Sequence, residues 1–196
     1  MTNKRKFPLI TVLSLLLSVL IIAALPTEAE GNIYEDTIRV HILANSDSEE
    51  DQSLKLKIRD RLINKYSDIL STYENKSEAM FIAEEMLDEI ERDVILWIRD
   101  FGYDYNAKAE LVTEWYDTRY YNDITMPKGY YTSLKIIIGE GEGQNWWCVM
   151  YPPLCLDVAT DDRLSVGYNG RQIALIKGEK YAVKFKILEL ISELTR

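Results

Sequence analysis

The sequence predicts an α+β fold, in which a mostly antiparallel sheet of about four strands carries three amphipathic helices. Four short segments alternate apolar and polar residues, as strands do, and three longer segments have apolar residues at helical spacing. One strand comes first, two helices and three strands follow, and a helix ends the chain. Helices and strands segregated in this way favour a sheet with its helices on one face.

The N-terminal segment has the order of a secretory signal peptide. Basic residues at 4–6 precede an apolar run over 9–25, and Thr27-Glu28-Ala29 offers a cleavage site. The run is close to the lower limit of about 17 residues for a membrane span, so an uncleaved anchor helix is the alternative. We therefore expect a signal peptide or N-terminal membrane anchor at 1–30 and a single exported domain at 31–196.

Composition and charge argue against several classes of function. The chain has 32 acidic and 23 basic residues, for a net charge of −9. Nucleic acid and anionic lipid both need a basic surface, so neither is an expected partner. His41 is the only histidine, which argues against a histidine-rich metal site and against a relay of several histidines. We expect no metal and no cofactor, and contact with the membrane only through the N-terminal segment.

The first strand and the first long helix follow from local patterns. Residues 37–43 alternate and are rich in β-branched side chains, which predicts a strand. His41 points away from the apolar face of that strand. Turn-forming residues follow, and Ser48 with Asp51 fits a capping box at the start of a helix over 49–71.

A second amphipathic helix is predicted over 78–101. Ser77 is its expected cap, and Gly102 stands where a C-terminal glycine belongs. The remaining expected elements are strands over 106–117, 130–138 and about 146–151, a surface connection over 157–171 and a final helix over 179–195.

The stretch 144–156 holds both cysteines of the chain and a Pro152-Pro153 corner. Outside the cytosol, Cys148 and Cys155 would close a short loop, with a stabilisation of about 2.5 kcal/mol on the chain-entropy model. The alternative is a pair of buried thiols in the core of the sheet. Two cysteines alone cannot complete a four-ligand zinc site. We expect the disulfide, because the chain carries an export signal.

Trp146 and Trp147 are adjacent in an expected strand, so their side chains should point to opposite faces of the sheet. One of them should enter the core. The other is either covered by local packing or is an exposed anchor for a protein partner, a role for which tryptophan is favoured. The pattern leaves both interpretations open.

His41, Asn45, Ser46 and Asp47 lie at the end of the first strand and in the loop beyond it, where functional residues often occur. A hydrolase that uses His41 and Asp47 is one interpretation. The members of catalytic triads usually converge from separate segments, so helix capping and partner binding are the favoured roles.

The glycine-rich loop 139–143 carries Glu140 and Glu142 and no lysine, which is unlike a phosphate loop. A flexible acidic hairpin is the first interpretation of this loop. A weak cation site or a pair of catalytic carboxylates is the alternative.

Several segments together resemble the stage II sporulation protein R family of endospore-forming bacteria. The resemblance covers nearly the whole expected exported part, and the block over 138–155 is its most specific portion. The segments are Ile38-Arg39-Val40-His41-Ile42-Leu43-Ala44-Asn45-Ser46-Asp47-Ser48, Asp51-Gln52, Leu54-Lys55-Leu56-Lys57-Ile58-Arg59-Asp60, Ile138-Gly139-Glu140-Gly141, Asn145-Trp146-Trp147-Cys148-Val149-Met150-Tyr151-Pro152-Pro153-Leu154-Cys155 and Val183-Lys184-Phe185-Lys186-Ile187.

That resemblance implies a signalling protein and not an enzyme. In the family, the protein is made in the forespore and exported into the space between the two membranes that separate forespore and mother cell. There it triggers a membrane-embedded aspartic protease, which cleaves the precursor of sigma-E. The rival interpretations are an exported hydrolase acting on cell-wall material and a small-ligand-binding module. The surface expected to bind the protease comprises His41, Asn45, Ser46, Asp47, Trp146, Trp147, Pro152 and Pro153.

Overall fold

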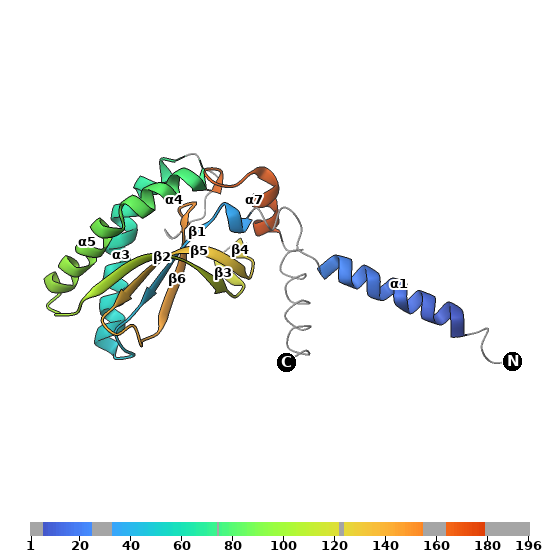
Figure 1. The fold of residues 1–196 in the computed structure, drawn as a ribbon, viewed down its shortest axis with the longest axis horizontal. Coiled ribbons are helices and arrows are strands. Elements are labelled where there is room, and N and C mark those ends of the chain that lie inside the picture. Colours follow the sequence, from blue (N-terminus) through green and yellow to red (C-terminus); the bar gives the residue numbers. More distant parts are fainter. Residues whose placement is uncertain (1–5, 25–32, 74, 122–123, 155–163, 179–196) are drawn as a thin grey trace.

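A four-stranded sheet forms the centre of the computed structural model (Figure 1). The structure describes residues 6–24, 33–73, 75–121, 124–154 and 164–178. The strands of the sheet are β1 (Ile38–Leu43), β2 (Ala107–Tyr116), β5 (Gly129–Ile138) and β6 (Asn145–Tyr151), in the spatial order β2-β5-β1-β6. All four lie within one or two residues of the strands that alternation predicts.

The sheet is mixed, so the expectation of a mostly antiparallel sheet is confirmed only in part. β2 pairs antiparallel with β5, and β1 pairs antiparallel with β6. The central pair, β1 with β5, is parallel. Parallel neighbours need a long crossover, and here the helices and β2 lie between the two strands in the sequence.

Helices α3 (Glu49–Ser71), α4 (Lys76–Glu85) and α5 (Leu87–Asp100) cover one face of the sheet (Figure 1). α3 has the predicted bounds, and the Ser48 side chain accepts the N–H of Asp51 at 3.2 Å. The predicted capping box lacks its second hydrogen bond, from the Ser48 N–H to the Asp51 side chain. The carboxylate of Asp51 bonds to loop side chains instead.

The single helix predicted over 78–101 is wrong in two respects. The segment forms two helices, which meet at Met86, and the first begins at Lys76 with Asn75 as its cap instead of Ser77. The predicted end is confirmed, since Gly102 follows α5 with a φ of 87°, a conformation that favours glycine.

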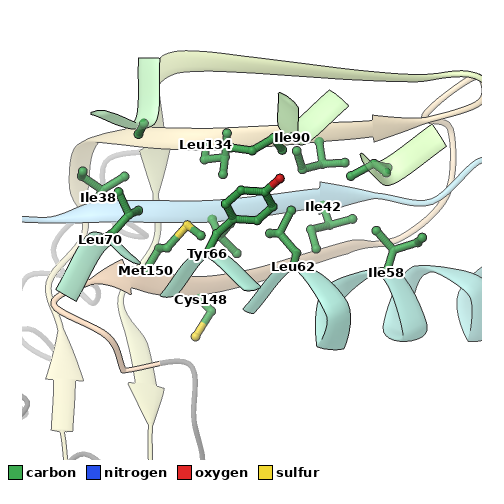
Figure 2. Close-up of a cluster of buried hydrophobic side chains, with 14 of the residues drawn as sticks. Ile38, Ile42, Ile58, Leu62, Tyr66, Leu70, Ile90, Leu134, Cys148 and Met150 are labelled. Atoms are coloured by element: carbon green, nitrogen blue, oxygen red, sulfur yellow. The ribbon is translucent and has the colours of Figure 1, made fainter. Parts of the chain in front are cut away.

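Apolar side chains of the sheet and helices meet in one core (Figure 2). Ile38, Val40 and Ile42 of β1 all point toward the helices and are fully buried. Figure 2 shows Leu62 and Tyr66 of α3 against this strand. The alternation read from 37–43 therefore gives the correct inward face.

A smaller apolar cluster lies on the opposite face of the sheet. There the two-stranded ribbon of β3 (Arg119–Tyr121) and β4 (Ile124–Met126) packs together with α7 (Gly170–Lys177). Neither the ribbon nor α7 was predicted. Leu164 and Tyr168 are buried in this cluster, so the surface connection expected over 157–171 is wrong where the structure describes it. The final helix expected over 179–195 lies outside the described residues.

Helix α1 (Lys6–Ala24) corresponds to the expected signal or anchor segment. In Figure 1 it lies apart from the sheet, and apolar side chains such as Leu13 and Leu15 are exposed. Of the helices in the described ranges, none combines the length and the apolar character that a membrane crossing requires. The role of α1 as a signal or an anchor stays a prediction.

Candidate functional site

The face of the sheet turned away from α3, α4 and α5, here called the outer face, carries charged and polar strand residues. On β1 these are Arg39 and His41. Ser133 and Lys135 of β5 are their register partners on one side, and Trp147 of β6 is the partner of His41 on the other. Alternation along three strands thus gathers these side chains into one layer.

His41 is held between two oxygen atoms. Its Nδ1 lies 2.8 Å from Oε1 of Glu114, and its Nε2 lies 2.8 Å from Oδ1 of Asn145. The Trp147 ring lies at a centroid distance of 5.4 Å, and only 6% of His41 is exposed. Both imidazole nitrogens are therefore engaged by other side chains of the protein in this arrangement.

Glu114 is the centre of the polar network on the outer face. Besides His41, it accepts a hydrogen bond from the Tyr116 hydroxyl at 3.0 Å, and its Oε2 lies 3.9 Å from Nζ of Lys135. The Tyr116 hydroxyl also lies 2.6 Å from Oγ of Ser133. Burial raises the pKa of Tyr116, and the charge of Glu114 adds to the rise. The phenol therefore stays protonated and acts as a donor.

Arg39 is fully buried and pairs with no carboxylate in the described part of the chain. Its Nε donates to the carbonyl oxygen of Cys148 at 3.0 Å, and its Nη2 donates to the Tyr121 hydroxyl at 2.7 Å. Its Cζ lies 4.3 Å from the ring centroid of Tyr116 and 5.1 Å from that of Tyr131. Nη1 has no hydrogen-bond partner among the residues that the structure describes. Aromatic ring faces, and not a carboxylate, thus stabilise this cation.

Arg119 stacks on Trp147, with its Cζ 4.2 Å from the ring centroid. The Nε of Arg119 is buried and has no hydrogen-bond partner in the described part of the chain. On the other side of the sheet, Trp146 lies beneath Arg59 of α3, at 5.3 Å from its Cζ. The expectation that the two tryptophans face opposite ways is confirmed. Both are half-buried, so each is covered by an arginine and not by the apolar core alone.

The loop after β1 interlocks with the loop between β5 and β6. Oδ1 of Asn45 accepts the N–H of Glu140 at 3.0 Å, and Oδ1 of Asp47 accepts the N–H of Gln144 at 2.7 Å. These two side chains therefore satisfy backbone groups that would otherwise lack partners at the end of the sheet. The carboxylate of Asp47 bonds to Gln144 and not to His41, so the structure does not bring the proposed catalytic pair together.

Asp51 anchors the loop after β1 to the first turn of α3. Its Oδ2 accepts hydrogen bonds from Oγ of Ser46 at 2.6 Å and from Nδ2 of Asn45 at 2.8 Å. Burial alone would raise the pKa of Asp51, but these bonds and one from Tyr105 outweigh burial and lower it. The carboxylate is thus the form that holds the loop.

Lys55 ties the second loop to the same helix. It is 4% exposed, and its Nζ donates to the carbonyl oxygen of Gln144 at 2.7 Å and to Oε1 of Gln52 at 2.6 Å. Burial lowers the pKa of Lys55, and the charge of Asp47 acts against that effect. Both loops are therefore held in position by contacts within the chain itself.

The predicted partner-binding residues fall into two places. Those from β1 and its loop lie beside both tryptophans, because His41 pairs with Trp147 in the sheet register. Pro152 and Pro153 follow the opposite end of β6, are buried, and begin with a cis Tyr151–Pro152 peptide bond. The structure thus separates the proline corner from the other members of the predicted surface.

The predicted disulfide cannot be placed, because Cys155 lies outside the described residues, and it stays a prediction. Cys148 is buried and belongs to the core cluster on the helix-covered side of the sheet (Figure 2).

Sequence reasoning did not single out Arg39, Glu114, Tyr116 or Asn145. The alternation over 106–117 puts Glu114 on the polar side of its strand, but alternation does not tell which residue on a distant strand it meets. One signal was available for Arg39, which interrupts a strand that is otherwise suited to burial.

The outer face presents a stacked arginine and tryptophan. Among the described residues, no group of three histidine, cysteine or acidic side chains could hold a metal ion. The face offers instead an arginine stacked on a tryptophan and a hydrogen-bonded network that fixes both. Arginine and tryptophan are the residue types most enriched at the energetic centres of protein interfaces.

Comparison with known proteins identifies the family. The protein-family model described as Stage II sporulation protein R (spore_II_R) matches residues 34–161, so the chain belongs to that family. A relative, "Stage II sporulation protein R" of Bacillus subtilis (strain 168), is 33% identical over 123 residues. The match covers 63% of this chain and 55% of the relative, about half of the relative's length. No solved structure matches. Membership confirms the resemblance found in the sequence and indicates a role in sporulation.

Proposed function

We propose that the protein is an exported signal of endospore formation. It leaves the forespore, enters the space between forespore and mother cell, and activates the membrane-embedded aspartic protease that processes the precursor of sigma-E. Family membership over residues 34–161 is the observation that carries the proposal. The basic and apolar start of the chain supports the export step.

The outer face near Trp147 is the proposed contact with the protease. Arg119 lies over the Trp147 ring and His41 contacts it, and the loops beside it are fixed by Asp51 and Lys55. A surface ordered in advance loses less conformational entropy on binding, which favours affinity. Activation requires that this surface bind the active arrangement of the protease more tightly than the inactive one.

Processing of the sigma-E precursor in sporulating cells tests the proposal. The test uses cells in which this chain is the only member of its family that is produced. Trp147→Ala should strongly reduce processing while leaving the amount of exported protein unchanged. Trp115→Ala is the matched control, because Trp115 is 52% exposed on β2 but outside the Trp147 cluster.

Loss of processing in Trp115→Ala with normal processing in Trp147→Ala would assign the contact to another surface. Full processing in cells that lack the protein altogether would reject the signalling function itself.

An exported hydrolase is the second candidate, and the contact of His41 with Glu114 is what favours it, since a carboxylate often orients a catalytic histidine. Purified protein should then release soluble fragments from cell-wall material, and His41→Gln should stop that release. Unchanged signalling after single substitution of His41, Asp47, Glu140 and Glu142 would remove this candidate.

A further inference from the structure

Within the described part of the chain, Arg39 and Arg119 of the outer face have no carboxylate partner, although the chain as a whole is acidic. Acidic residues outnumber basic ones by 32 to 23, yet neither Arg39 nor Arg119 forms an ion pair with a described residue. Each has a buried guanidinium nitrogen that has no hydrogen-bond partner in the described ranges. On the helical side, by contrast, Arg61 pairs with Asp100 at 2.9 Å. Arg39 is fully buried and acts on a partner only through its charge, whereas Arg119 is half-buried, so a carboxylate that reaches its guanidinium would be bound favourably.

Two aromatic rings connect the two arginines. Tyr116 lies under Arg39 at 4.3 Å and touches the Trp147 ring at a centroid distance of 6.2 Å, and Arg119 covers that tryptophan. Among the described residues, Glu114 is the acidic side chain of this cluster. Its carboxylate already contacts His41, Tyr116 and Lys135. The Arg119 guanidinium lies over the Trp147 ring, and a guanidinium presents its N–H donors in a fork that matches a carboxylate.

We propose that the Arg119–Trp147 stack, with the buried cation Arg39 behind it, binds a carboxylate side chain presented by the partner. This inference rests on the proposed function and specifies its chemistry: an aspartate or glutamate in a segment of the protease that faces the space between the membranes. A single carboxylate fits better than a polyanion, because the net charge of −9 repels highly charged ligands.

Peptide binding to the full chain tests this inference. The probes are fluorescent peptides that cover the outward-facing segments of the protease, each made with its native acids and with every Asp and Glu replaced by the matching amide. At least one native peptide should bind, and its amide version should bind at least tenfold more weakly. Arg119→Gln should cause a loss of the same size, and Arg119→Lys a smaller one, because lysine keeps the charge without the fork.

Arg99→Gln is the matched control, since Arg99 is exposed on α5 beyond the opposite face of the sheet. It changes the net charge equally and should leave binding unchanged. Circular dichroism melts establish that each variant is folded. If Arg119→Gln does not fold, the comparison of Arg119→Lys with the native chain tests the inference instead. Titration with sodium acetate against sodium chloride at equal ionic strength, read from the Nε–H signals of the arginines, shows whether a free carboxylate reaches the same site.

Equal binding of the native and amide peptides, or an equal effect of Arg99→Gln and Arg119→Gln, would overturn the inference. If acetate binds at Arg119 but none of the peptides binds, the inference is also overturned, and the site is one for small carboxylates. Sigma-E processing that needs the protein but tolerates Arg119→Gln would leave the signalling function standing and remove only this inference.

Discussion

Replacing Asp51 by asparagine should loosen the two interlocked loops beside the Trp147 surface. The carboxylate is 4% exposed and accepts hydrogen bonds from Ser46 and Asn45 at 2.6 and 2.8 Å. It also lies in the first turn of α3, where negative charge is favoured. Asparagine keeps the shape of the side chain but loses the charge and one acceptor oxygen.

The size of the effect follows from these contacts. Hydrogen bonds to a charged acceptor contribute about 1.5–3 kcal/mol each, and asparagine retains part of that. The charge at the helix start contributes a further ~0.3–1 kcal/mol. We expect Asp51→Asn to lower the free energy of unfolding by about 2–3 kcal/mol in total. For a domain of this size, the melting temperature should fall by roughly 5–10 °C.

Thermal and urea unfolding at a series of pH values measure the effect. Because the folded-state pKa of Asp51 is lowered, its stabilisation is complete above the unfolded value of about 3.9 and is lost as the pH falls through the folded value. The difference in the free energy of unfolding between wild type and Asp51→Asn should therefore be constant between about pH 5 and 8. This difference should become smaller below about pH 4.

The control is Asp100→Asn, which removes an exposed surface ion pair with Arg61 and should cost less than about 1 kcal/mol. Equal costs for Asp51→Asn and Asp100→Asn, or a difference that persists unchanged at pH 3, would refute the role given to Asp51.

Three further substitutions test the packing and the network. Gly143→Ala should destabilise the fold by more than about 3 kcal/mol, because a Cβ would lie 2.2 Å from the carbonyl oxygen of Ser46. Gly102→Ala should cost only about 1 kcal/mol, for its left-handed backbone. Urea unfolding compares the two variants. Glu114→Gln should cost about 1–3 kcal/mol by the same measurement, since His41 loses its charged partner. Ile58→Ala should cost about 2–5 kcal/mol for the cavity it leaves in the core, and a cost below 1 kcal/mol would contradict the packing described.

Local patterns were sufficient to predict the elements that local chemistry controls. Alternation located β1 and its inward face, and the cap at Ser48 located the start of α3 within one residue. The break at Met86 was missed because helical spacing of apolar residues continues across it. The short ribbon of β3 and β4 was missed because three-residue strands carry too little alternation to be recognised.

Long-range pairing explains why the site was predicted only in part. His41, Trp147 and the loop residues were identified from their own segments, and the register of β1 with β6 brings them together. The partners of His41 come from β2 and β6, and their meeting depends on pairings between strands far apart in the chain. No local pattern encodes those pairings, so Glu114 and Asn145 could not be assigned to His41 from the sequence.

Site-specific photo-crosslinking in sporulating cells measures most directly whether the outer face touches the protease. One photoreactive residue is placed at Asn145, which is exposed on the outer face beside His41, and another at Leu96, which is 55% exposed on α5. The protein should form a covalent adduct with the protease from position 145 and not from position 96. An adduct from position 96 alone would show that the helical side makes the contact and would contradict the proposed surface.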